Sequence, residues 1–306
     1  MATQQLMLVN DSSTLANFVS WAQPISAFFA TCGWQQSSDT GQVNWGTLTT
    51  IPGNGAYVYE VWQPNDALPA YFLKVEYGNY SGSTNSPTVR LTLGTTTNGS
   101  GTITNNIIGP FYTSFSAYTA AGTGVQWPCY FSGTAGRMAI MMWRNGPNGC
   151  PMSFAVERSI TSSGVYTGTH VTLMAAGCGT SAYGTYQQQT LLFGVGVAPA
   201  PAVWANNNYY RSGCLPIRWF QPGQSVNGVY NAGFGFDTVA PYIGQWDQPL
   251  TSYGSGPVYN FVEGQSYTIE LYGQSITYIA TQSGYLGTCS PNNSSAKAGF
   301  FCMRIS

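Results

Sequence analysis

The single histidine of the chain, His170, is the first residue to consider for acid–base or nucleophilic chemistry. A Ser-His-Asp or Cys-His arrangement would have to run through it, and no serine lies in a Gly-x-Ser-x-Gly motif. One histidine also excludes a multi-histidine metal site within one chain. His170 opens a strand expected at 171–174, so we interpret it as a strand-end residue rather than a catalytic one.

Paired carboxylates are the more serious catalytic possibility, because glycoside hydrolysis needs only two of them. Glu76 and Glu157 fall in the middle of expected strands and are interpreted as cross-strand partners of Lys74 or Arg158. Four aspartates lie beside or within two residues of Gly, Pro, Asn or Thr and are interpreted as turn formers: Asp39, Asp66, Asp237 and Asp247. No pair of carboxylates is favoured, so we expect no catalytic residues and predict that the protein is not an enzyme.

Sequence motifs for cofactors and metals are missing as well. Glycine is abundant, with 37 residues, but neither a Gly-x4-Gly-Lys-Ser/Thr motif nor a well-placed Gly-x-Gly-x-x-Gly motif occurs. No Cys-x-x-Cys pair is present, and the acidic residues are too sparse for a calcium-binding loop. The sequence therefore predicts no cofactor and no metal.

Aromatic side chains are the residues most able to bind something. The chain has 9 Trp and 21 Tyr, and aromatic rings on a β scaffold can stack on sugars or anchor subunit interfaces. For any one of them, a place in the β core is the favoured interpretation. The candidate interface or ligand-binding aromatics are Trp204, Tyr209, Tyr210, Trp219 and Trp246.

Charge is unusually scarce in this chain. Charged residues make up 6% of it, against about a quarter in typical soluble domains, and the net charge is −1. No basic patch is present to bind phosphates, so nucleic acid is not an expected partner. No apolar run is long enough to span a membrane, and the N-terminus lacks signal-peptide features. We therefore expect no membrane insertion, and folding in a cytoplasm.

The seven cysteines cannot all pair within one chain, because their number is odd. Free buried thiols that pack as small apolar side chains are the favoured interpretation. Disulfides formed after release into an oxidising medium are the alternative. Cys129 with Cys150, and Cys289 with Cys302, would be the first pairs to examine.

One amphipathic helix is expected near the N-terminus, after possible N-caps at 10–13. Apolar residues recur there at three- and four-residue spacing, and Pro24 predicts either a kink or two short helices. This stripe is interpreted first as a cover for the neighbouring sheet and second as an anchor against another subunit. The candidate anchor residues are Leu15, Phe18, Val19, Phe28 and Phe29.

The remainder alternates with the period of β-strands. Strands at 56–62, 71–77 and 88–93 predict an antiparallel meander, and a second block has strands at 137–143, 154–159, 170–174 and 187–193. A hairpin is expected at 266–271 and 275–280, followed by a last strand at 299–305. The sequence thus predicts an all-β fold of antiparallel sandwich or meander domains with a short N-terminal helical segment.

Three regions are expected: an N-terminal helical anchor at 1–33, a β-rich domain at 34–197 with possible sub-blocks 34–127 and 128–197, and a C-terminal β-rich domain at 198–306. The boundary near 198 rests on the run Ala-Pro-Ala-Pro-Ala, which is typical of a short stiff linker.

Several stretches resemble structural proteins of tailed phages. They include GWQQSSDTGQVNW at 33–45, PTVRLTLGTTTNGSG at 87–101, CYFSGTAGRMAIMMWRNG at 129–146 and YTIELYGQSITYIA at 267–280. The resemblance touches most of the chain, but its motifs are strand and turn patterns, and no functional residue is carried over from it. It implies a virion subunit of the tail, tail tip, baseplate or fibre apparatus, homo-oligomeric and in contact with other virion proteins.

Two alternatives stay open. One is a capsid decoration or head-fibre protein. The other is an adhesin that binds or cleaves carbohydrate, with a polysaccharide of the host surface as the partner for attachment.

Overall fold

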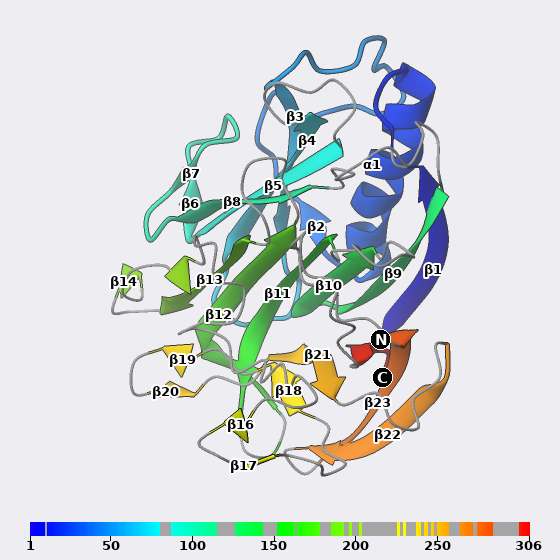
Figure 1. Ribbon diagram of the computed structural model, residues 1–306. Coiled ribbons are helices and arrows are strands. Elements are labelled where there is room, and N and C mark those ends of the chain that lie inside the picture. The colour runs from blue at the N-terminus through cyan, green and yellow to red at the C-terminus, as the bar shows by residue number, and fades with distance from the viewer. Residues whose placement is uncertain are drawn as a thin grey trace.

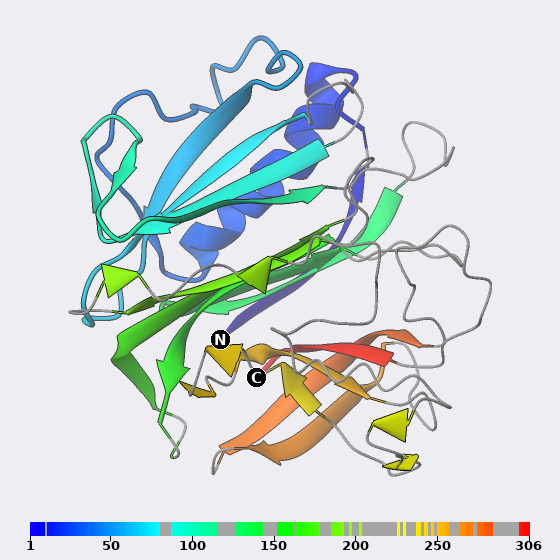
Figure 2. The ribbon, with the colours of Figure 1, turned by 60° about the vertical axis from the view of Figure 1, so that its left-hand side comes forward.

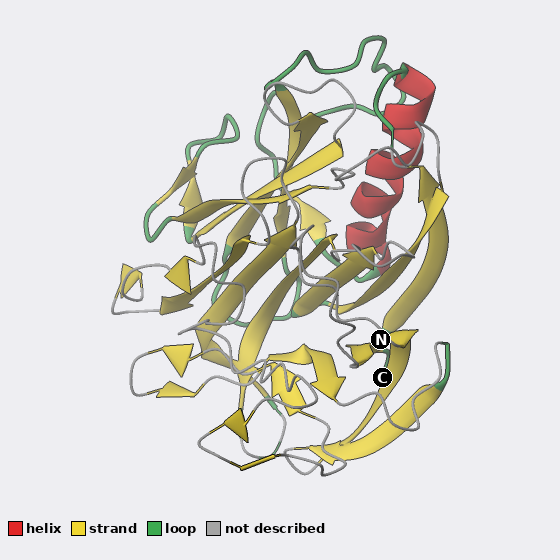
Figure 3. Cartoon of the chain, viewed as in Figure 1, coloured by secondary structure: helices red, strands yellow, loops and turns green. Residues whose placement is uncertain are grey.

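The computed structural model shows an all-β protein with one α-helix near its N-terminus (Figures 1 and 3). The structure describes residues 1–9, 11–79, 87–114, 126–142, 152–177 except 162 and 164, 185–192, 196–197, 202–203, 225–226, 229–230, 237–239, 242–243, 246–247, 250–256, 264–271, 274–283 and 300–306. Three large antiparallel sheets hold most of the described strands.

The N-terminal sheet is a five-stranded meander in the order β2-β3-β4-β5-β8. Its strands are β2 (Gln35–Gln36), β3 (Tyr57–Gln63), β4 (Phe72–Asn79), β5 (Pro87–Gly94) and β8 (Ile108–Ser114). Alternation places Leu73, Val75 and Tyr77 on the core face and Lys74 on the outer face, as the sequence predicts. A small hairpin, β6 (Thr96–Thr97) with β7 (Ile103–Thr104), lies between β5 and β8 along the chain.

The central sheet has eight strands, ordered β1-β9-β10-β11-β12-β13-β14, with β15 also paired to β13. Its strands are β1 (Ala2–Val9), β9 (Gln126–Thr134), β10 (Arg137–Met142), β11 (Met152–Ile160), β12 (Tyr166–Gly177), β13 (Thr185–Leu192), β14 (Gly196–Val197) and β15 (Ala202–Val203). The strands expected in the second β block therefore lie side by side here, and β13 pairs with β12.

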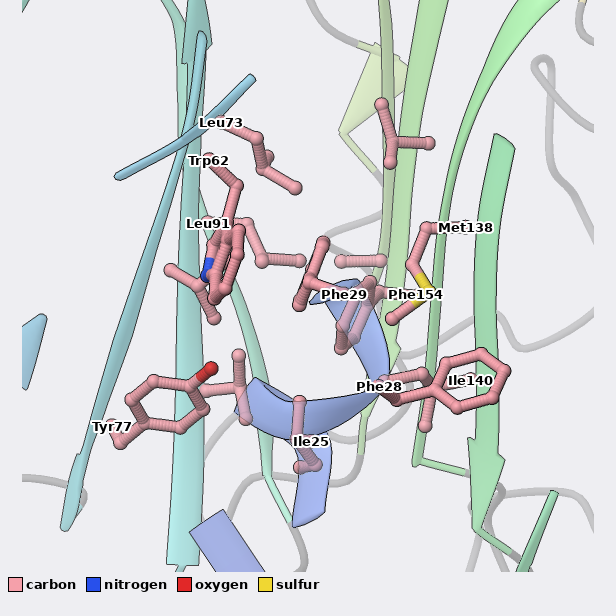
Figure 4. Packing of buried hydrophobic residues seen from close by; sticks show 14 of the residues in the cluster. Ile25, Phe28, Phe29, Trp62, Leu73, Tyr77, Leu91, Met138, Ile140 and Phe154 are labelled. Carbon is pink, nitrogen blue, oxygen red and sulfur yellow. The ribbon is translucent and has the colours of Figure 1, made fainter. Parts of the chain in front are cut away.

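Helix α1 (Leu15–Thr31) lies between these two sheets (Figure 2). Phe29 stacks on Trp62 of the N-terminal sheet at a centroid distance of 5.3 Å, and Phe28 contacts Phe131 of the central sheet at 5.2 Å. Figure 4 shows the helix side chains pointing into both sheets. A helix buried from two sides completes a core that neither sheet forms alone, because each sheet buries its inner face against the helix.

Pro24 sits inside α1, which is one continuous helix rather than two short ones. The helix begins after Thr14, whose side-chain oxygen accepts a hydrogen bond from the backbone N–H of Asn17 at 3.2 Å. Asp11, one of the expected cap residues, instead holds the turn before the helix by accepting from the Ser13 N–H at 2.7 Å and from the Asn17 side chain at 2.7 Å.

The C-terminal sheet covers the other face of the central sheet (Figure 2). Its order is β18-β21-β24-β23-β22, with strands β18 (Asp237–Val239), β21 (Leu250–Gly256), β22 (Ser266–Leu271), β23 (Gln274–Ser283) and β24 (Phe300–Arg304). The expected hairpin is β22 with β23, and the expected last strand is β24. Two further strand pairs are β16 (Ser225–Val226) with β17 (Val229–Tyr230), and β19 (Tyr242–Ile243) with β20 (Trp246–Asp247).

Within the region predicted as an N-terminal anchor, β1 and α1 contribute side chains to the core formed with the sheets of the other regions. β1, which the sequence pattern does not predict, pairs with β9 along its whole length, and α1 fills the space between the sheets. The strands β2 to β8 lie within 34–127 and β10 to β14 lie within 128–197, whereas β9 crosses the boundary between these sub-blocks. β15 begins where the Pro/Ala run ends, with 198–201 outside the described residues. Within the described part of the chain, no helix is long and apolar enough to cross a membrane.

Candidate functional site

The first group of polar side chains with chemical potential is buried between α1 and the N-terminal sheet, around Glu60 of β3. Its Oε1 accepts hydrogen bonds from Ser26 Oγ at 2.7 Å and Trp45 Nε1 at 2.9 Å. Its Oε2 accepts from Tyr77 OH at 3.1 Å and Trp62 Nε1 at 3.3 Å. The Glu60 cluster therefore joins the helix, the loop after β2 and two strands through one carboxylate.

Burial raises the pKa of Glu60 above its ordinary value of 4.5, and the four hydrogen bonds act in the opposite direction. A buried acid with a raised pKa is a common feature of general acids. Here, however, both oxygens already have two donors each, and Glu60 is 2% exposed. The arrangement satisfies the carboxylate and leaves no site for a reacting atom next to it.

A second polar group links the loop after β3 to the central sheet. Asp66 receives hydrogen bonds from Arg158 of β11, from Nε at 2.5 Å and from a terminal nitrogen at 2.9 Å. Arg158 also donates to the Pro69 carbonyl at 2.9 Å and lies over the Tyr71 ring at 4.8 Å. Asp66 also accepts from the Leu68 N–H, as its predicted role in a turn requires. Arg158 was predicted to be the cross-strand partner of a mid-strand glutamate. The structure shows instead that it binds the turn residue Asp66 through two nitrogens of its guanidinium group.

A third polar group lies between the central and C-terminal sheets. Ser252 of β21 donates its N–H and its hydroxyl to Glu157 of β11, at 3.0 and 2.7 Å. Arg137 of β10 donates to the Ser252 hydroxyl oxygen at 3.2 Å and to Ser132 Oγ at 2.7 Å. All four side chains are buried. Ser252 of the C-terminal sheet thus forms hydrogen bonds with two charged residues of the central sheet, Arg137 and Glu157.

The outer face of the N-terminal sheet carries a fourth group, a row of two charged residues flanked by two tyrosines across four strands. Tyr59, Glu76, Arg90 and Tyr112 are consecutive cross-strand neighbours on β3, β4, β5 and β8. Arg90 binds Glu76 through Nε at 2.6 Å and also through a terminal nitrogen, and Lys74 lies 3.2 Å from the same carboxylate. Lys74 is thus a partner of Glu76, but it lies on the same strand, and the cross-strand partner of Glu76 is Arg90.

Two tyrosine rings on this outer face, Tyr57 and Tyr59, are already covered by cations. Lys74 Nζ lies 4.4 Å from the Tyr59 ring centroid, and a Cβ on Gly101 would lie 2.2 Å from the same ring. Arg90 lies 4.4 Å from the ring centroid of Tyr57. Sugar stacking needs a free ring face, so Tyr57 and Tyr59 serve the sheet itself. Tyr112, 39% exposed, is the most open ring of the group.

The single histidine lies in a cluster of hydroxyls on β11 and β12. His170 Nδ1 is 2.7 Å from Thr169 Oγ1 and 3.4 Å from Ser159 Oγ, and burial lowers the pKa of the ring. Ser159 is closer to Thr167, at 2.5 Å, than to the histidine. The nearest partner of the ring nitrogen is thus a threonine, which does not match the serine–histidine geometry of a nucleophilic site.

The side chains of two cysteines, Cys32 and Cys129, are described, and both are free and buried. Burial raises the pKa of Cys32 to about 12 and that of Cys129 well above its ordinary value. Cys129 is therefore not in the disulfide considered with Cys150, and Cys289 lies outside the described residues. Among the residues placed by the structure, no three His, Cys, Asp or Glu side chains gather to hold a metal ion.

The predicted interface aromatics fall largely outside the described residues: Trp204, Tyr209, Tyr210 and Trp219. Trp246 begins β20, where it pairs with Ile243, and its side chain is not described. Of the candidate anchor residues, Phe18, Phe28 and Phe29 are at most 1% exposed in the core of this same chain. Leu15 and Val19 are half-buried. The helix thus covers its own sheets, which was the first interpretation of its apolar stripe.

The three buried polar groups were not recognisable from the sequence, because their members come from different elements. Ser26 and Glu60 are 34 residues apart, and Glu157 and Ser252 are 95 apart. No protein-family model matches the chain, and no curated protein matches it significantly.

Proposed function

We propose that the chain is a non-enzymatic structural subunit of a tailed-phage particle, located in the tail, tail tip, baseplate or fibre apparatus. It works by assembling with other virion proteins and by contact with the host surface. The sequence resemblance supports the location, and the physical properties of the described sheets support the mode of action.

The observation that carries the proposal is that buried charged residues form hydrogen bonds between the layers of the fold. The Glu60 cluster joins the helix to the N-terminal sheet, the Asp66–Arg158 pair joins a loop to the central sheet, and the Glu157–Ser252 contacts join the central and C-terminal sheets. Buried ionic and hydrogen-bonded contacts are screened by salt much less than exposed ones. Such a scaffold keeps its shape outside the cell, where a virion component has to work.

Immunogold electron microscopy of intact particles tests this location, with antibody raised against the recombinant chain. We expect label confined to the tail or its tip. Antibody pre-absorbed with the purified chain is the control for non-specific label. Label over the head would replace the tail assignment with a capsid decoration or head-fibre protein.

If the antibody detects the chain on a blot but labels no particle, the virion proposal is overturned. The carbohydrate adhesin would then be the remaining function to test. Tryptophan fluorescence titrated with host polysaccharide should change in that case, and replacement of Trp204 or Tyr209 by Ala should abolish the change. Release of reducing ends would indicate cleavage as well as binding.

A further inference from the structure

Strand β1 forms one edge of the central sheet. It pairs with β9 over eight consecutive residues with no shift in register, from Ala2 opposite Gly133 to Val9 opposite Gln126. No described strand pairs with its other side, and in Figure 1 it lies at the right-hand margin of the molecule. Alternate backbone N–H and C=O groups of such a strand point outward and can pair with another strand.

The other edge strands of the large sheets carry features that discourage pairing. β8 contains Pro110 and a shift in register against β5, and β22 contains Glu270. β18 has three residues, an aspartate and a register shift, while β2, β14 and β15 have two residues each. β1 is long and regular, and has neither a proline nor a charged residue. Among the described edges, it alone is suited to pairing.

The described residues on and next to this edge are also uncharged. Thr3, Gln4, Gln5 and Met7 of β1 are exposed, and Met7 is 52% exposed. Helix α1 contacts β1 and lies on the same side of the molecule (Figure 1). Its exposed residues are small or neutral: Ala16, Ser20, Gln23, Ala27, Ala30 and Thr31. This exposed helix face therefore carries no charge that would repel a second copy of the chain.

We propose that β1 pairs antiparallel with β1 of a second copy of this chain about a two-fold axis, so that two central sheets become one continuous sheet. This inference does not depend on the virion assignment. An isologous contact of this kind needs one surface only. A strand with charged residues would place like charges near each other across the axis, whereas β1 has none to repel its own copy.

The faces of the two strands also match under this symmetry. Even-numbered residues of β1, namely Ala2, Leu6 and Leu8, pack toward the core, and odd-numbered residues face the other way. In antiparallel pairs, directly opposed residues lie on the same face. A register with Gln5 opposite its own copy places even residues opposite even ones and Met7 opposite Thr3 of the second copy. The apolar side of both strands then stays on the core side of the joined sheet.

The experiment measures molar mass by light scattering after size exclusion, over a range of concentrations, on the full chain with any tag at its C-terminus. We expect the unmodified chain to have twice its monomer mass of 32.8 kDa. In a double variant with Thr3→Lys and Met7→Lys, the dissociation constant of the dimer should rise about tenfold or more, because four lysines lie close together at the axis. The matched control is Thr268→Lys on the edge strand β22, which should leave the mass unchanged.

A second variant separates repulsion from misfolding. Thr3→Glu with Met7→Glu should also dissociate, and an equimolar mixture of the Lys and Glu variants should recover the doubled mass, since unlike charges then face each other. A monomeric unmodified chain, or a Lys variant as dimeric as the unmodified one, would overturn the proposal. Failure of the mixture to associate would overturn it too, provided both variants keep their cooperative unfolding. None of these outcomes bears on the immunogold result.

Discussion

At the scale of the residue, Glu60 shows how one carboxylate organises the space between helix and sheet. Its four donors come from the helix, a loop and two strands, so the carboxylate is fully used although no cation is among those partners. Two of the donors are indole N–H groups, which can donate but cannot accept. The cluster therefore depends on an acceptor at this position, and a neutral amide is an imperfect replacement.

We predict that Glu60→Gln destabilises the fold by about 1–3 kcal/mol near neutral pH, because the amide nitrogen then faces donors and leaves an indole N–H unpaired. The raised pKa also sets a pH dependence. The folded state holds the Glu60 proton more tightly than the unfolded state, so stability falls as pH rises from 4.5 through the raised folded value. Urea unfolding of both proteins across this window should show their stabilities converging as pH rises. Parallel curves would contradict a titrating Glu60.

The buried thiols give a second prediction at this scale. Because burial holds the pKa of Cys32 at about 12 and that of Cys129 well above its ordinary value, almost no thiolate forms at pH 8. Mass spectrometry after thiol alkylation of the native protein should find both unmodified. The same reagent in denaturant should label both, which controls for oxidation. Native labelling of either residue would contradict its placement in the core.

At the scale of the element, the β6–β7 hairpin is held against the N-terminal sheet by close contacts at Gly101. Asp39 accepts from the Gly101 N–H at 2.7 Å and from Thr97 Oγ1 at 2.8 Å, and Tyr59 donates to the Ser100 carbonyl at 3.1 Å. The backbone at Gly101 approaches the Tyr59 ring so closely that only glycine leaves enough space.

Gly99 and Gly101 make a matched pair for a test of this contact. Both have a left-handed φ, +80° and +81°, but a Cβ on Gly99 would meet nothing within 4 Å. Gly99→Ala should therefore cost about 1–2 kcal/mol for the backbone conformation alone. Gly101→Ala should cost about 1–3 kcal/mol more, because its methyl group displaces the Tyr59 ring. Thermal unfolding measures both, and equal losses would argue against a tight hairpin–sheet contact.

Element prediction from the sequence succeeded where periodicity was clear. The alternation at 56–93 predicted β3, β4 and β5, and the 266–280 pattern predicted the β22–β23 hairpin. β1 was missed because Gln4 and Gln5 interrupt the alternation of its apolar residues. The apolar stripe of α1 predicted that the helix covers one sheet. It did not predict that the helix lies between two sheets, because the spacing of apolar residues does not give the number of sheets that pack against a helix. The contacts of Glu60 and Ser252 depend on that stacking, so the sequence could not predict them.

At the scale of the whole molecule, the described layers are fastened by different kinds of contact. Aromatic packing dominates around α1, where the Phe29 ring contacts Trp34 and Trp62 at centroid distances of 5.4 and 5.3 Å. The C-terminal sheet is held to the central sheet through the buried Arg137, Glu157 and Ser252. A polar junction that loses one partner leaves buried charges unsatisfied, which costs far more than the loss of one exposed contact. A substitution at this junction can therefore show whether the C-terminal sheet unfolds together with the central sheet or separately from it.

We predict that Ser252→Ala releases the C-terminal sheet before the rest of the molecule. The variant removes the hydroxyl that joins Arg137 to Glu157, so the amides of β21 and β24 should exchange faster in hydrogen–deuterium exchange, while those of β3–β5 stay protected. Thr268→Ala, an exposed change in the same sheet, is the control and should leave both regions as they are. If exchange instead rises equally in both regions, the layers unfold as one cooperative unit. Separate opening would support an independent C-terminal region, since only a weakly coupled layer can lose protection while the sheets around α1 keep theirs.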